Sequence, residues 1–150
     1  MQQVKSKKRV ADHGEVFTSE REVSAMLDLV KQETDRVDSK FLEPACGTGN
    51  FLAEILRRKM EVVVRRYKGN QHDFERNSIT AISSIYGVDI LRDNTIECRE
   101  RLFKIFDEIY IKIYKKKTKD KVRDTVQFIL QRNIVLGDAL SLETVDDIPK

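Results

Sequence analysis

The sequence contains few of the residues from which metal sites and disulfide frameworks are built. It holds two cysteines and two histidines, none of them in a closely spaced pair: Cys46, Cys98, His13 and His72. Zinc sites are usually built from such pairs, and small secreted domains use many more cysteines. We therefore expect neither a bound metal ion nor a disulfide bond.

Long apolar runs are also missing. No stretch approaches the roughly 20 apolar residues that a membrane-spanning helix needs. The basic N-terminus, MQQVKSKKRV, lacks the apolar segment of a secretory signal, so we expect a cytoplasmic protein without membrane contact. The net charge is only +3, which is compatible with nucleic-acid binding but does not argue for it. A chain of 150 residues is long enough for one domain with a core.

Hydrophobic periodicity predicts alternating helices and strands. Residues 1–12 form a basic arm without periodicity, and Ser19 and Glu22 have the spacing of a capping box. Helices are predicted from Ser19 to an end near 34–39 and over 52–63, 74–84, 102–113 and 122–130, and strands over 41–43, 86–90 and 133–136, with a turn-like tail over 141–150. Because parallel strands need crossover connections, this alternation predicts an α/β fold with a parallel sheet.

The most specific motif is FLEPACGTGNF, residues 41–51. A strand ends at Glu43, and Gly47 and Gly49 then open a helix, so the backbone can approach a ligand without a Cβ clash. The motif lacks the third glycine of dinucleotide sites and the Gly-Lys-Ser/Thr of phosphate loops. Glu43 would repel a phosphate and suits a positively charged group, such as an amine or a sulfonium. The alternative is a tight turn that binds nothing.

EPACGTGNFL resembles the S-adenosylmethionine-binding motif of class I methyltransferases. Within it, the proline after the acidic residue and the phenylalanine after GTGN are typical of adenine-specific DNA methyltransferases of restriction–modification systems. The resemblance implies a cofactor-binding role for Glu43, Pro44, Ala45, Gly47, Gly49, Asn50 and Phe51.

Two further segments extend the resemblance. HGEVFTS, residues 13–19, is similar to the motif that precedes the Rossmann-like core of these enzymes, which implies that Phe17 and Thr18 line the methionine end of the cofactor. GVDI, residues 87–90, resembles the end of the second strand. There Asp89 would accept from the ribose hydroxyls and Ile90 would form an apolar wall against adenine. From the residue type alone, Asp89 could equally cap the following helix.

A fourth segment, NIVLGDAL at residues 133–140, resembles the end of the third strand. The resemblance implies that Asp138 accepts from the exocyclic amine of the cofactor's adenine, with Ala139 beside it. Taken alone, Asp138 could also be an ordinary turn residue. Four such segments in the family's order are a far more specific signal of this resemblance than any one of them.

The sequence departs from the family in two respects. The interval from Gly49 to Asp89 is about twice the roughly 20 residues expected between a glycine turn and its ribose acid, and an inserted helix over 74–84 can absorb the difference. The catalytic Asn/Asp-Pro-Pro-Tyr/Phe motif is absent, since the only prolines are Pro44 and Pro149. We therefore expect residues 13–150 to be a partial methyltransferase domain with strand order 3-2-1 and no catalytic residue.

The resemblance implies a parent enzyme that methylates the N6 amine of adenine in DNA, while this chain alone is expected to be inactive. Its partners would be DNA, contacted mainly through missing parts, and a specificity or restriction subunit. The unpaired edge of the strand at 41–43 could also drive self-association. The alternatives are a non-catalytic S-adenosylmethionine-binding module and an RNA or protein methyltransferase fragment. The basic run over 115–121 could contact DNA, but we favour a solvated loop.

Overall fold

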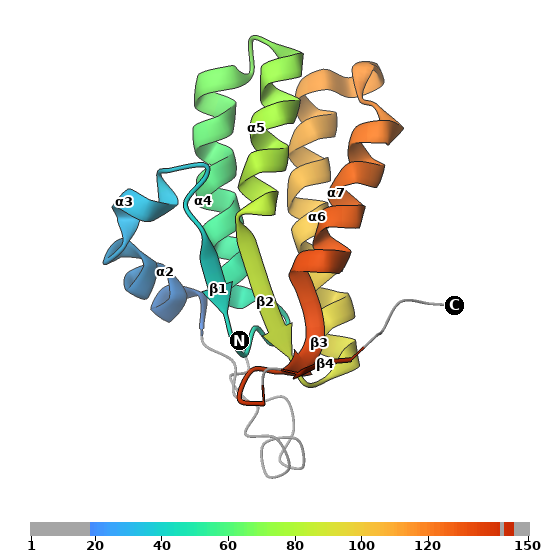
Figure 1. The fold of residues 1–150 in the computed structure, drawn as a ribbon. Coiled ribbons are helices and arrows are strands. Elements are labelled where there is room, and N and C mark those ends of the chain that lie inside the picture. Colours follow the sequence, from blue (N-terminus) through green and yellow to red (C-terminus); the bar gives the residue numbers. More distant parts are fainter. Residues whose placement is uncertain (1–18, 142, 146–150) are drawn as a thin grey trace.

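The computed structural model describes residues 19–141 and 143–145, and it has the expected α/β class. Three short strands lie side by side and parallel: β1 (Phe41–Glu43), β2 (Ile85–Asp89) and β3 (Ile134–Asp138) (Figure 1). A fourth, β4 (Glu143–Thr144), pairs antiparallel with β3, so the order is β1-β2-β3-β4. In the described part of the chain β1 is therefore an edge strand, and its Leu42 side chain is 67% exposed.

Most of the described residues are helical. The helices are α2 (Glu20–Asp28), α3 (Lys31–Thr34), α4 (Asn50–Tyr67), α5 (Gln71–Ser83), α6 (Arg92–Tyr114), the short 3₁₀ helix η1 (Lys115–Lys117) and α7 (Asp120–Asn133). The capping box at the start of α2 is confirmed, because Ser19 Oγ accepts from Glu22 N and Glu22 Oε2 accepts from Ser19 N. Within the described ranges, no helix is both long and apolar enough to cross a bilayer.

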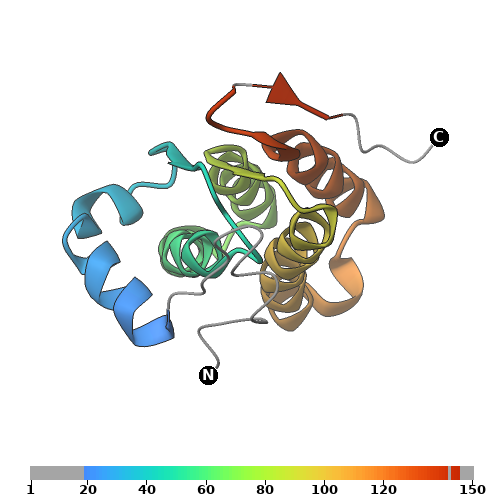
Figure 2. The same ribbon diagram turned by 90° about the horizontal axis from the view of Figure 1, so that it is seen from below.

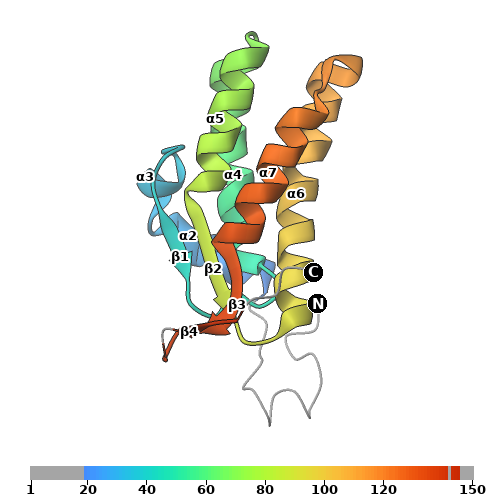
Figure 3. The same ribbon diagram turned by 45° about the vertical axis from the view of Figure 1, so that its right-hand side comes forward.

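The four long helices form a bundle that extends past the sheet. In the order α4, α5, α7, α6, each helix packs against the next, and α6 packs against α4. Viewed along their axes, the four helices form a square (Figure 2). Helices α4 and α6 begin near the carboxyl ends of β1 and β2 and run beside the sheet, whereas α5 and α7 end where β2 and β3 begin (Figure 3). Phe74, Phe106 and Tyr110 are fully buried between them. Burial of each such side chain stabilises the fold by about 1.5–3 kcal/mol.

Three features differ most from the predictions. The single helix predicted from Ser19 is broken at Leu29 and Val30 into α2 and α3. Helix α6 begins at Arg92, ten residues before the predicted start. The hydrophobic pattern did not reveal its first turns, because they bury the small side chains of Asn94, Thr95 and Cys98 and no large apolar ones. The prediction of a turn-like tail is wrong at β4, which makes the sheet mixed and four-stranded. Gly137 allows this pairing, since a Cβ there would lie 2.5 Å from the carbonyl oxygen of Glu143.

A buried ammonium group holds the sheet together at the amino ends of its strands. Lys59 on α4 is fully buried, and its Nζ donates to the carbonyl oxygens of Val37 (3.0 Å) and Ser39 and to Ser84 Oγ (2.7 Å). Val37 and Ser39 precede β1, and Ser84 precedes β2. The Nζ also lies 5.3 Å from the ring centroid of Phe41. Burial lowers the pKa of Lys59 from 10.5 to about 8.

We predict that Lys59 makes the stability of the protein depend on pH in the alkaline range. Below pH 8 the side chain is protonated in both states, so its contribution is constant. Between about 8 and 10.5 the unfolded chain binds more protons, so the free energy of unfolding rises with pH, by at most about 3 kcal/mol. Lys59→Met removes this rise and destabilises the protein at neutral pH by about 1–3 kcal/mol, because buried acceptors lose their donor.

Urea unfolding of both proteins at several pH values measures the difference. Arg65→Met, at an exposed position near the end of α4, is the control and should leave both quantities unchanged. If the free energies of unfolding of the wild type and Lys59→Met change in parallel between pH 8 and 10.5, Lys59 is not the source of the pH dependence.

Candidate functional site

The glycine turn between β1 and α4 is fixed to the neighbouring strand. Cys46 N donates to the carbonyl oxygen of Val88 on β2 (2.9 Å), and Gly49 N donates back to the carbonyl oxygen of Cys46 (2.9 Å). Gly47 and Gly49 have φ values of 56° and 92°, a region that favours glycine. Helix α4 then begins at Asn50 with its N-terminus at the carboxyl end of β1, where open α/β sheets bind ligands.

Gly49 is required for packing as well as for its backbone conformation. A Cβ at this position would lie 2.7 Å from Cys98 Sγ on α6. Cys46 is buried, and a hydrogen bond with Cys98, together with burial, raises the pKa of the Cys46 thiol. The Cys46 thiol is therefore a space-filling contact between the turn and α6 rather than a nucleophile, and Cys98 is fully buried against it.

Asp89 joins the glycine turn to the start of α6. Its Oδ2 accepts from Gly47 N at 2.9 Å, and its Oδ1 accepts from Leu91 N at 2.9 Å and from Asn94 Nδ2 at 3.2 Å. The carboxylate is almost fully buried. The structure thus brings together Gly47 and Asp89, which the sequence placed 42 positions apart. Asp89 is not the N-cap of α6, which is Leu91, but its carboxylate accepts from the Leu91 amide and from the Asn94 side chain at the start of that helix.

Glu43 is the last residue of β1 and is half-buried beside the same turn. Burial raises the pKa of its carboxyl group, and a hydrogen bond from the backbone of Ala45 partly opposes that rise. A carboxylate that has lost part of its hydration is stabilised by a nearby positive charge. Partial burial of Glu43 is therefore compatible with a cationic neighbour and would disfavour a phosphate.

The other candidate residues lie around the carboxyl ends of the strands. Asp138 ends β3 and is exposed, with Oδ1 accepting from Leu140 N at 2.9 Å. Of the remaining residues, Ala139 and Phe51 are half-buried, whereas Pro44, Ala45 and Ile90 are exposed. Phe17, Thr18 and the arm over 1–12 lie outside the described residues.

Sequence reasoning missed Arg101, which clamps the start of α4. Its Nη1 donates to the carbonyl oxygen of Thr48 (3.0 Å) and to Asn50 Oδ1 (2.9 Å), so α6 holds the glycine turn from a second side. The same arginine lines a cavity of about 280 Å³ between α2, α4 and α6, together with Val23 and Arg57. Helical spacing in α6 could have placed Arg101 on the face towards α4, but not its contact with the turn.

A larger cavity, of about 680 Å³, lies between α6 and α7. It is lined by apolar side chains such as Phe103 and Phe128 and by charged ones such as Arg99. It contains none of the candidate residues, and Arg99 also donates to the carbonyl oxygen of Ile134 at the start of β3. We therefore place the candidate site at the glycine turn, where the backbone geometry and the carboxylates converge.

Comparison of the chain with protein-family models, with curated proteins and with solved structures gave no match.

We predict that Gly49→Ala destabilises the protein by about 2–4 kcal/mol, because the positive φ and the contact with Cys98 Sγ both penalise a side chain. Replacing the thiol by Cys98→Ala should make the added cost of Gly49→Ala smaller, since the clash disappears while the backbone strain remains.

Urea unfolding of the four proteins in this cycle measures the coupling. Gly69→Ala is the matched control, because a Cβ at Gly69 meets no atom within 4 Å. An equal cost of Gly49→Ala with and without Cys98 would show that the thiol does not restrict the turn.

Proposed function

We propose that the chain is the S-adenosylmethionine-binding part of a cytoplasmic, site-specific DNA methyltransferase that acts on the N6 amine of adenine. One observation carries the proposal: Glu43, Asp89 and Asp138 stand at the carboxyl ends of three adjacent parallel strands, beside a glycine turn that opens a helix. This arrangement suits a ligand with a positive charge, a diol and an amine. The resemblance of the four sequence segments identifies S-adenosylmethionine as such a ligand.

The donors and acceptors of the site fit most of this cofactor. Glu43 can face the sulfonium or the amino group, because its half-buried carboxylate gains from a positive neighbour. An ionised carboxylate offers about four acceptor positions, and Asp89 uses three of them internally. One ribose hydroxyl can therefore bind directly, and a second has to replace an internal donor. Asp138 Oδ2 remains for the adenine amine, within the described residues.

In this proposal the residues of the chain bind and orient, while S-adenosylmethionine supplies the methyl group. Gly47 brings its backbone close to the ligand, and Asp89 and Arg101 hold the glycine turn in place from β2 and α6. Positioning of this kind can account for a large part of a methyl-transfer rate once the target base is also held. No Asn/Asp-Pro-Pro-Tyr/Phe segment for holding that base occurs in the 150 residues.

We predict that the purified chain binds S-adenosylmethionine and that Glu43→Gln weakens binding about tenfold, the effect of losing one charge-assisted interaction. Because burial already disfavours the charged carboxylate, the same substitution should not lower the stability of the free protein. Gly47→Val should abolish binding, since its side chain would occupy the space of the ligand.

Isothermal titration calorimetry on folded protein measures these affinities. Glu143→Gln removes an equivalent charge from the exposed strand β4 and serves as the control that should leave the affinity unchanged. Equal affinities for the wild type, Glu43→Gln and Gly47→Val would place the cofactor elsewhere.

We further predict that the chain alone transfers no methyl group to DNA, because the groups that hold the target base are absent from its sequence. The measurement is the incorporation of labelled methyl from S-adenosylmethionine into adenine-containing DNA. Incorporation above a protein-free blank would refute this prediction without affecting the binding assignment.

A further inference from the structure

The helical bundle ends in a basic surface at the end remote from the glycine turn. Two connections meet there: the turn between α4 and α5, and the η1 connection between α6 and α7 (Figure 1). Helix α4 has 18 residues, which places this end about 27 Å from the start of α4. We call the surface formed by residues 65–77 and 112–121 the basic platform.

The platform concentrates positive charge that the composition of the whole chain conceals. Its two segments hold ten Lys and Arg residues against three Asp and Glu residues, whereas the rest of the chain holds 18 against 22. The overall charge of +3 is thus the sum of a strongly basic end and a slightly acidic remainder. The exposed cations are Arg65, Arg66, Lys68, Arg76, Lys112, Lys115, Lys116, Lys117, Lys119 and Lys121.

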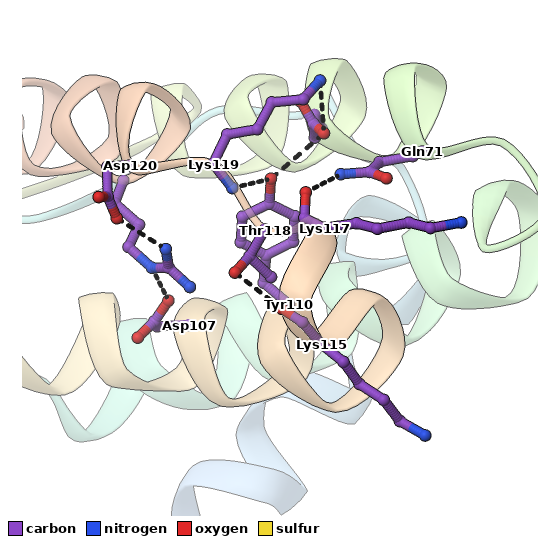
Figure 4. A network of polar contacts seen from close by, with 10 residues as sticks. Gln71, Asp107, Tyr110, Lys115, Lys117, Thr118, Lys119 and Asp120 are labelled. Carbon is purple, nitrogen blue, oxygen red and sulfur yellow. Dashed lines mark hydrogen bonds and ion pairs between the residues drawn. The ribbon is translucent and has the colours of Figure 1, made fainter.

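Hydrogen bonds join the two connections into one surface. Gln71 Nε2 donates to the carbonyl oxygen of Lys117 (2.8 Å), and Tyr114 Oη donates to the carbonyl oxygen of Lys68 (2.9 Å). The buried Tyr110 Oη accepts from Lys119 N (3.0 Å) in the network drawn in Figure 4. The backbone of the connection is therefore fixed by the protein itself.

The platform's own acidic side chains leave its central lysines unneutralised. Glu75 is buried and is used by Tyr110 and Lys119, and Asp120 pairs with Arg123 on α7. The third, Asp73, lies 4.0 Å from His72 Nδ1. The side chains of Lys115 and Lys117 point away from this network (Figure 4). Lys115, Lys116 and Lys117 make no side-chain ion pair within the described residues.

We propose that the basic platform binds the phosphate backbone of DNA, as a sequence-independent contact separate from the cofactor site. Exposed lysines on a fixed surface attract a polyanion at many positions without reading bases. The choice of DNA as the polyanion rests on the proposed function. An anionic membrane is the less favoured partner, because Ile111 is the one large exposed apolar side chain within or beside the platform in the described residues, so little could insert between lipids.

The test is fluorescence anisotropy of a labelled random-sequence DNA duplex titrated with the full chain at several salt concentrations. We expect binding that weakens steeply between about 50 and 200 mM salt. Neutralising the connection with Lys115→Gln, Lys116→Gln and Lys117→Gln together should weaken binding about tenfold. It should also reduce the slope of log K against log salt by about 3, because each lost phosphate contact removes about 0.9.

The matched control is Lys31→Gln, Arg36→Gln and Lys40→Gln together, which removes the same charge from exposed positions on α3 and before β1. Equal weakening by both triple variants would overturn the proposal, as would the absence of wild-type binding at low salt. Binding to vesicles of anionic phospholipid without binding to DNA would also overturn it.

Calorimetry with S-adenosylmethionine on the same proteins separates the two proposals. The platform variant should keep the wild-type cofactor affinity. A failure to bind cofactor with intact DNA binding would refute the proposed function alone.

Discussion

The buried ammonium of Lys59 is the constraint on which the arrangement of the sheet depends. A cation without water needs acceptors on every donor, and here they come from the carbonyl oxygens of Val37 and Ser39 and from the hydroxyl of Ser84. These three residues precede two different strands. The ammonium therefore aligns the entry of β1 with the entry of β2, and a strand of only three residues gains a fixed register that its own hydrogen bonds could hardly secure.

A carboxylate has the equivalent position at the other ends of the same strands. Asp89 ends β2 and accepts from the turn that follows β1 and from the start of α6. The two charges act independently, because each is satisfied by its own neighbours at opposite ends of β2. Between them the parallel pair β1-β2 is held at both ends, and the glycine turn takes its shape from Asp89, Arg101 and the contact with Cys98.

Much of this organisation could be predicted from the sequence, because it depends on local patterns. Alternating periodicities located the three parallel strands and the helices between them, and the spacing of Ser19 and Glu22 located a helix start. Three of the four short segments placed Glu43, Asp89 and Asp138 at the ends of adjacent strands, and the segment over 13–18 lies outside the described residues. The spacing of Lys59 also indicates its burial, because it lies three residues after Leu56 and four before Val63, on the apolar face of its helix.

The remaining features depend on contacts between distant segments, which local patterns do not report. The early start of α6 rests on Asn94 and Cys98, whose burial follows from their contacts with Asp89 and Gly49. Strand β4 has two exposed residues and no alternation to reveal it, and it depends on the missing side chain of Gly137. The basic platform joins residues 46 positions apart through Gln71 and Lys117. In sequence the run over 115–121 indicated only a solvated loop.

The internal bonds of Asp89 have a consequence for any ligand that reaches it. The carboxylate already accepts from the Gly47 amide in the free protein, so its orientation is set during folding and not at the moment of binding. A hydroxyl group that takes the place of this amide exchanges one hydrogen bond for another. For that hydroxyl the affinity gained is the small difference between two similar bonds, unlike the gain of a hydroxyl that uses the fourth acceptor position. Discrimination by the exchanged bond must come from whether the displaced Gly47 amide finds a new acceptor on the ligand itself.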